Sequence, residues 1–294
     1  MNLRRPGVFA FLDELSGAQT IDFARAVEAL GYCALWITEV FGRDCLVHAA
    51  TLLSHTERLV IATGIANIYK RQPIAMAGAA RQLAEQFGDR FVLGLGVSNR
   101  EVSAARGLGF GKPVAEMRDY LAAMRSAPYR APAPQTETPI VIAGMRPRML
   151  RLALEETQGT HTYFAPPEFV AKIRGQYPQD KWICAEQAVM LETDPVKART
   201  AAREYMKIYL RLESYRANLR SIDFNDSDFE NGGSDRLVDA IVAWGDAETM
   251  RKRVAAQYTA GATHVCVLPL KPEGGLAPDL RALEALAPLL TRSS

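Results

Sequence analysis

The sequence lacks the cysteine pattern of a disulfide-stabilised or metal-binding domain. It has four cysteines, which form no CxxC pair and stand far apart, at Cys33, Cys45, Cys184 and Cys266. Three of them lie in apolar runs, where an unpaired cysteine behaves as a small buried hydrophobic residue. We therefore expect no disulfide and a reducing compartment.

Long hydrophobic runs and an excess of one charge are also absent. The N-terminal apolar stretch has about six residues, too few for a signal peptide, and no run approaches the roughly 20 residues of a membrane span. The 35 basic and 33 acidic residues almost cancel, so the chain has no basic surplus of the kind that binds nucleic acid. We expect a cytoplasmic protein without a membrane or nucleic-acid partner.

Several catalytic motifs are missing as well. The four histidines are isolated from one another and from carboxylate clusters, so no metal site is expected. GLGVSN has Asn99 where a dinucleotide-binding fingerprint needs its third glycine. RGLGFGKP fails as a P-loop, because Arg106 and Pro113 replace the first glycine and the final Ser or Thr. No GxSxG motif exists, so there is no signal for a nucleophilic serine.

What the chain does have is a regular alternation of short apolar runs with helical patterns. Eight runs are strand-like, at residues 7–12, 34–38, 59–65, 91–96, 140–144, 159–164, 183–191 and 264–268. Nearly unbroken apolar strands that alternate with helices indicate a parallel sheet covered by helices. Eight such units in 294 residues predict an α/β fold, a TIM (β/α)₈ barrel.

One segment interrupts this alternation between the seventh and eighth strands. Residues 213–233 are polar and rich in Asn, Asp, Ser and Gly, and we interpret them as an inserted loop over the barrel mouth. The Pro- and Ala-rich residues 127–139 are interpreted as an internal loop, because the alternation resumes after them. The prediction is one domain over residues 1–294.

In a TIM barrel the chemistry lies at the carboxyl ends of the strands. Polar residues that follow the predicted strands are therefore the candidates for a site. They are Asp13, Glu39, Asn67, Ser98, Asn99, Arg146, Arg148, Tyr163, Glu192 and Lys271.

Four segments together resemble a known family. They are ALWITEVFGRD, LVIATGIANIYKRQPIAMAGAARQLAEQFGDRFVLGLGVSNRE, TPIVIAGMRPRMLRLA and TMRKRVAAQYTAGATHVCVLPL. They are similar to the luciferase-like monooxygenase superfamily and, within it, to the F420-dependent oxidoreductases. The similarity extends over nearly the whole chain apart from the insertion, and the second segment is the most specific part of it.

The resemblance implies a cofactor across the carboxyl-terminal mouth of the barrel. Glu39 matches an acidic residue near the cofactor and is the nearest candidate for a catalytic group. Gly64 and Ile65 match a bulge in the third strand that supports the cofactor ring, with a non-prolyl cis peptide between them. Asn67 matches a polar contact to the ring.

Further cofactor contacts are implied in the next two loops. They are Gly96, Ser98 and Asn99 after the fourth strand, and Gly144, Met145 and Arg146 after the fifth. From the residues themselves, Arg146 and Arg148 flank Pro147 at a helix start, where free N–H groups and arginines favour a phosphate. Lys70, Arg71 and Arg100 are expected to face the acidic tail of F420.

The chain departs from the family's sugar-phosphate dehydrogenases at three places. Val40 stands in place of a histidine, Asn99 in place of a glutamate, and Met145–Arg146 in place of a glycine pair. A sugar-phosphate substrate is therefore not expected, and Glu39 is left as the candidate acid.

The leading hypothesis is an F420-dependent oxidoreductase that transfers a hydride between the deazaflavin and a small organic substrate. Extra basic residues favour F420, since FMN carries only one terminal phosphate. The alternatives are an FMN-dependent monooxygenase and a catalytically idle flavin-binding protein. A homodimer is also possible.

Overall fold

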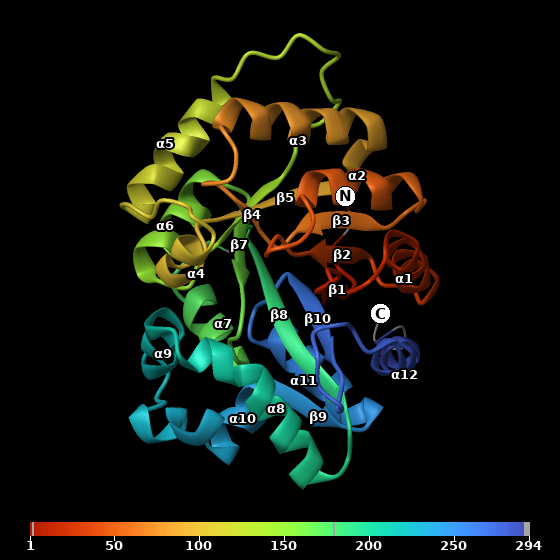
Figure 1. The fold of residues 1–294 in the computed structure, drawn as a ribbon, viewed down its shortest axis with the longest axis vertical. Coiled ribbons are helices and arrows are strands. Elements are labelled where there is room, and N and C mark those ends of the chain that lie inside the picture. Colours follow the sequence, from red (N-terminus) through yellow and green to blue (C-terminus); the bar gives the residue numbers. More distant parts are fainter. Residues whose placement is uncertain (2, 179, 291–294) are drawn as a thin grey trace.

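The computed structural model describes residues 1, 3–178 and 180–290 (Figure 1). It confirms the predicted barrel. Ten strands are present in this part of the chain: β1 Gly7–Ala10, β2 Ala34–Ile37, β3 Val60–Thr63, β4 Ala66–Asn67, β5 Phe91–Gly96, β6 Ile140–Ala143, β7 Gly159–Thr162, β8 Trp182–Leu191, β9 Val242–Gly245 and β10 His264–Leu270.

Eight of these strands form a closed ring of parallel pairs. The order is β1, β2, β3, β5, β6, β7, β8 and β10, and β10 pairs with both β8 and β1. Strand β4 continues the line of β3 after a two-residue bulge and pairs with the end of β5. The ring is the eight-stranded TIM barrel that the alternation of apolar runs predicts.

Helices surround the ring (Figure 1). Their bounds are α1 Gly17–Ala29, α2 Cys45–Ser54, α3 Pro73–Phe87, α4 Arg100–Ala105, α5 Pro113–Arg125, α6 Pro147–Glu156, α7 Pro167–Arg174, α8 Pro195–Leu210, α9 Glu213–Arg220, α10 Asp235–Ile241, α11 Ala247–Thr259 and α12 Leu280–Leu290.

Local capping signals explain where several helices begin. The side chains of Ser16, Asp44 and Asp194 each accept hydrogen bonds from backbone N–H groups in the first turn of α1, α2 and α8. Such caps satisfy donors that have no partner within the helix. Each cap places its helix start directly after a strand-to-helix loop, where the candidate site residues lie.

Two buried clusters fill the molecule. The outer cluster lies between the ring and most of the surrounding helices, and the inner cluster fills the ring and continues to α8, α9 and α10. Along β2, Leu35 and Ile37 join the outer cluster, whereas Ala34 and Trp36 join the inner one. This alternation follows from the two faces of a strand. The ring of Trp36 lies 4.7 Å from the ring of His161 on β7, so the two side chains meet across the barrel interior.

The inserted segment differs from the prediction of a loop. Residues 213–233 contain helix α9 and a 3₁₀ segment, Asp226–Gly232. Phe229 in that segment is buried and packs under the guanidinium groups of Arg216 and Arg220. Because Leu219 and Phe229 belong to the inner cluster, the insertion is a packed cap rather than a free loop. Helices α8, α9 and α10 lie together at the lower end of the molecule in Figure 1.

Strand β9 was not predicted. It pairs with Ala188–Leu191 of β8, beyond the point where β7 stops pairing with that strand. Its four residues follow α10 without an intervening turn, so their apolar pattern merges with that of the helix. Among the described residues, no helix is both long and apolar enough to cross a membrane.

Candidate functional site

The bulge after β3 brings four of the predicted residues together. The peptide bond between Gly64 and Ile65 is cis, as the resemblance implies. The next two residues pair with β5, so that Asn67 lies opposite Gly96. Any β-carbon on Gly96 would lie 2.6 Å from the Ile65 side chain, and one on Gly64 would lie 2.6 Å from the ring of Phe9. Both glycines are therefore needed for close packing at this bulge.

Glu39 follows β2 and is held from three sides. Its carboxylate accepts two hydrogen bonds from the guanidinium of Arg71 and one from the backbone N–H of Asn67, at 3.0 Å. The ammonium of Lys70 lies 3.7 Å away. The side chain of Glu39 has no exposed area.

These contacts determine the charge of Glu39. Burial alone would raise the pKa of this carboxyl, but the hydrogen bonds from Arg71 and Asn67 and the two positive charges outweigh it and hold the pKa below its ordinary value. Glu39 is thus an ionised carboxylate in this conformation. It ties the end of β2 to the bulge and offers no proton to a ligand.

Asn67 has one free group at this point. Its side-chain oxygen accepts a hydrogen bond from the N–H of Tyr69, at 2.9 Å. Its amide nitrogen is fully buried and has no hydrogen-bond partner among the described residues. Buried donors are rarely left without a partner, so this nitrogen marks a position where a ligand acceptor would be stabilised.

The loop after β5 is only partly as expected. Ser98 is exposed and has a positive φ of 59°. The side-chain oxygen of Asn99 caps the short helix α4 by accepting the N–H of Val102 at 2.8 Å. That oxygen is therefore engaged in the loop itself, and Asn99 keeps its amide nitrogen for other contacts.

The expected basic patch is only partly free to meet an acidic tail. Arg71 is paired with Glu39 and with Asp44, and its side chain is only 14% exposed. Arg100 donates to the carbonyl of Phe110 and stacks over that ring. The expectation for Arg71 is wrong, because its guanidinium is already paired with the buried carboxylate of Glu39 and with the more exposed carboxylate of Asp44.

The turn after β6 retains the features of an anion site. Arg146 and Arg148 are exposed and flank Pro147, the first residue of α6. No side chain caps this helix, and within the described chain neither guanidinium has a hydrogen-bond or ion-pair partner. Because β6 pairs with β5, this helix start lies one strand away from Gly96. Gly144 and Met145 lead into it, and the Met145 sulfur accepts the N–H of Tyr163 at 3.5 Å.

Of an aromatic cluster beside this turn, the sequence analysis identified only Tyr163. The hydroxyl of Tyr163, after β7, lies 3.0 Å from that of Tyr205 and 2.7 Å from that of Tyr209. Tyr215 on α9 packs edge-on against Tyr163 and Tyr209. The four-residue spacing of Tyr205 and Tyr209 places them on one face of α8, and this spacing was the available signal.

Glu186 was missed as well, although an acid inside the apolar strand ICAEQAVML is unusual. One of its oxygens accepts the N–H of Phe164 at 2.9 Å, and the other is buried without a partner. Burial raises the pKa of this carboxyl to about 8, and the hydrogen bond from Phe164 only partly opposes the shift. At neutral pH Glu186 is therefore mostly protonated.

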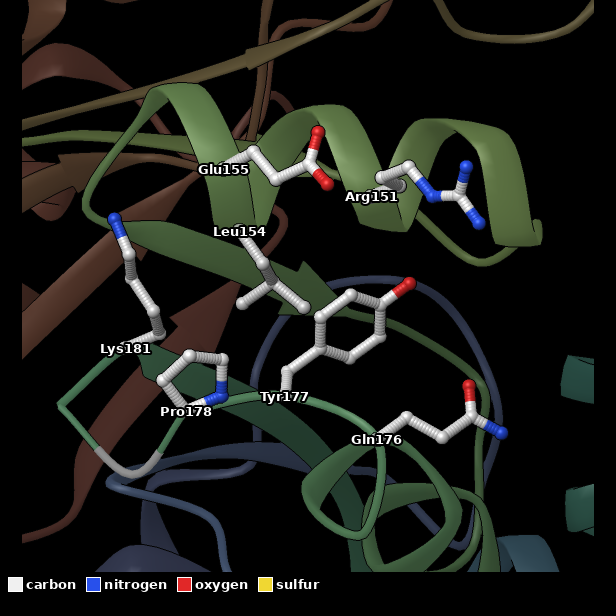
Figure 2. A pocket seen from close by; sticks show the side chains of 7 residues that line it. All are labelled: Arg151, Leu154, Glu155, Gln176, Tyr177, Pro178 and Lys181. Carbon is white, nitrogen blue, oxygen red and sulfur yellow. The ribbon is translucent and has the colours of Figure 1, made fainter.

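An open pocket of about 700 Å³ lies away from these residues. Figure 2 shows Arg151, Leu154 and Glu155 of α6 above Tyr177, with Lys181 at one side. Lys181 directly precedes β8, and Glu155 is near the end of α6, so the pocket belongs to the amino-terminal end of the barrel. Active sites of TIM barrels lie at the carboxyl ends of the strands, so the candidate site is the mouth and not this pocket. Among the described residues there is also no group of side chains suited to hold a metal.

Comparison with known proteins identifies relatives that match most of the chain. The family model described as luciferase-like monooxygenase matches residues 7–264. A Mycobacterium tuberculosis protein named as a coenzyme F420-dependent oxidoreductase is 25% identical, covering 90% of this chain and 93% of its own.

Solved structures with this fold include proteins that use either cofactor. An F420-dependent secondary alcohol dehydrogenase, in complex with an F420–acetone adduct, has a TM-score of 0.74 and 17% identity over 98% of both chains. The oxygenating constituent of 3,6-diketocamphane monooxygenase from Pseudomonas putida, in complex with FMN, has a TM-score of 0.67 and 16% identity. It covers 97% of this chain and 98% of its own. At these identities the likeness concerns the fold alone.

Proposed function

Because the chain belongs to the luciferase-like monooxygenase family, we propose that it is an F420-dependent oxidoreductase acting on a small organic molecule. The Mycobacterium relative, which is similar over nearly its full length, supports F420 as the cofactor. The observation that carries the proposal is the uncapped start of α6, where two arginines have no partner among the described residues. This helix follows β6, and β5 lies between β6 and the strand that leads into the Gly64–Ile65 bulge.

The residues at the mouth fit a flat ring that bears a phosphate. Ile65 offers an apolar surface, and the buried amide nitrogen of Asn67 offers a donor to an acceptor on the ring. Arg146 and Arg148 and the first turn of α6 offer donors and positive potential to the phosphate. Gly96, Ser98, Asn99, Gly144 and Met145 complete the proposed set on the two adjoining loops.

The cofactor, when bound, would accept or donate the hydride. The chain's own residues would bind and orient it, which is the usual division of work in cofactor enzymes. The bulge would limit how far the ring can sink into the barrel. Glu39 would act by fixing Arg71 and the N–H of Asn67, and so the shape of the bulge, because its carboxylate is already fully paired.

FMN is the second candidate. The Pseudomonas structure with FMN has the same fold, and a site for one phosphate would serve either molecule. Arg71 is already paired with Glu39 and Asp44, so it no longer counts among the basic residues that favour F420 over FMN. A catalytically idle flavin-binding protein is the remaining alternative, and turnover with a substrate panel would distinguish it.

The test is a fluorescence titration of the purified protein with F420 and with FMN side by side. We expect F420 to bind more tightly. Equal or tighter binding of FMN would replace the proposal with a flavin-dependent monooxygenase. A protein that binds either cofactor but turns over no substrate would support the idle alternative.

A further inference from the structure

The tyrosine cluster at the mouth is built from three separate parts of the chain. Tyr163 follows β7, Tyr205 and Tyr209 lie on α8, and Tyr215 lies on α9 of the insertion. All four side chains are half-buried, so the cluster reaches the surface of the molecule. Two covering helices therefore hold these side chains together at the end of one barrel strand.

The hydroxyls at the centre of this cluster have spare hydrogen-bonding capacity. A phenolic hydroxyl donates one hydrogen bond and accepts up to two. Tyr163 shares one hydrogen bond with Tyr205 and one with Tyr209, and neither Tyr205 nor Tyr209 has a side-chain hydrogen bond to a group outside the cluster in the described structure. A polar atom of a bound molecule can therefore be added to the cluster without displacing an existing bond.

A second observation at the same place is the buried Glu186. Glu186 is only 2% exposed, and one of its carboxyl oxygens has no hydrogen-bond partner among the described residues. Glu186 accepts the N–H of Phe164, the residue after Tyr163, and the ring of Phe164 lies 4.9 Å from that of Tyr209, which places Glu186 close to the cluster. A buried carboxyl with an unused oxygen is a feature that needs a partner or a function.

The carboxyl, hydroxyl and imidazole groups of this cluster are largely uncharged at neutral pH. Burial raises the pKa of Glu186 to about 8 and that of Tyr163 and Tyr205 well above 10. Burial lowers the pKa of His161, beneath the cluster, to about 3. A charged molecule would lose its hydration here without gaining an opposite charge, which is strongly unfavourable.

The cluster adjoins the proposed cofactor position through one aromatic ring. The rings of Phe9 and Tyr163 pack together, with centroids 5.3 Å apart. Gly64 of the bulge lies directly against the ring of Phe9. Phe11 continues the apolar surface, 5.7 Å from Phe9. A molecule that contacts Tyr163 would therefore lie next to the bulge.

We propose that Tyr163, Tyr205, Tyr209 and Glu186 form the subsite for the substrate's oxygen, and that the substrate is an uncharged aromatic or alicyclic ketone or alcohol. The hydroxyl cluster binds the oxygen, and Phe11, which is partly exposed and packs against the buried Phe9, contacts the ring. This inference rests on the proposed function for its direction, since it places the oxygen-bearing carbon near the cofactor, but its test does not require the cofactor.

The test measures binding of acetophenone, an uncharged aromatic ketone, to the cofactor-free protein by calorimetry or saturation-transfer NMR. We expect acetophenone to bind, and benzoate and benzylammonium, which have the same ring but a charge, to bind at least tenfold more weakly. Tyr163→Phe should weaken acetophenone binding about five- to tenfold, because one hydrogen bond to a neutral acceptor is lost.

Two controls keep the result interpretable. Tyr177→Phe, in the pocket at the other end of the barrel, should leave acetophenone binding unchanged. Tyr205→Phe serves as a second test variant, and circular dichroism checks that each variant is folded. Unaltered binding by both test variants, equal binding of benzoate, or no binding of acetophenone at all would overturn the inference.

An F420 titration on the same samples separates this inference from the proposed function. If F420 fails to bind while acetophenone responds as expected, the cofactor assignment fails and the subsite stands. If F420 binds normally but acetophenone binds the tyrosine variants as tightly as the wild type, only the subsite is wrong.

Discussion

At the residue scale, Glu186 couples stability to pH. Its pKa is raised to about 8 in the folded protein, whereas an unfolded glutamate titrates near 4.5. Between these values the unfolded chain has released the proton that the folded chain keeps, so stability falls as pH rises. The buried histidines His48, His161 and His264 have lowered pKa values and act in the opposite direction, but only below about pH 6.5.

Between pH 6.5 and pH 8 the effect of Glu186 on stability is therefore separated from that of the three histidines. We expect the free energy of unfolding to fall by about 2 kcal/mol across this range, at about 1.4 kcal/mol per pH unit. Glu186→Gln cannot ionise and should abolish the fall. Urea unfolding at several pH values measures it, and a Glu186→Gln protein with the wild-type slope would contradict the assignment.

Glu39 contributes to stability through its buried ion pairs. Glu39→Gln removes the charge that holds Arg71 and Lys70, and we expect a loss of about 2–3 kcal/mol, since a buried charge is left without its main partner. Urea denaturation measures the change. The control is Glu57→Gln, whose carboxylate is 84% exposed beside Arg58 and should contribute almost nothing. Unchanged stability with lost turnover would instead restore Glu39 as the catalytic acid.

At the element scale, the start of α6 is the phosphate site that we propose. Arg146→Ala combined with Arg148→Ala should weaken F420 binding about tenfold or more, because charge-assisted contacts are lost. Arg151→Ala is the matched control, since it removes an exposed arginine from the same helix. Fluorescence titration measures the F420 affinity of the wild type, the double variant and the control. A double variant that binds F420 as tightly as the wild type would mean that the phosphate binds elsewhere.

The insertion shows how an element can be misjudged from composition. Residues 213–233 are polar, but Leu219 and Phe229 point inward and anchor α9 and the 3₁₀ segment to the inner cluster. Two apolar anchors in a polar segment give no periodic signal. The position of the insertion was correctly predicted, and its local structure was not.

At the scale of the whole molecule, the homodimer remains a prediction. Val47 on α2 and Ile74 on α3 are 68% and 53% exposed, and the two helices are neighbours. We propose that this face joins two copies, so light scattering should report twice the 32.3 kDa of one chain. Val47→Asp with Ile74→Asp should yield a monomer. Val196→Asp, at an equally exposed site on α8, should not. A monomeric wild-type protein would rule out the dimer.

The barrel and the places of its strand ends were determined by the sequence itself. Apolar runs such as 59–65 and 91–96, the caps at Asp44 and Asp194, and the glycine at position 64 are local signals, because backbone geometry and helix starts depend on residues a few positions apart. The resemblance located the bulge and the α6 turn in the same way, by contiguous motifs.

Only the tertiary structure decided which side chains meet. Arg71 could have faced solvent, but the fold of the loops presents it to Glu39 and Asp44. Tyr163, Tyr205 and Tyr209 are separated by up to 46 residues, and Glu186 comes from another strand. Their contacts, and the pKa shift of Glu186, arise because closing the ring and folding α8 over it removes these groups from water together, which no local pattern encodes.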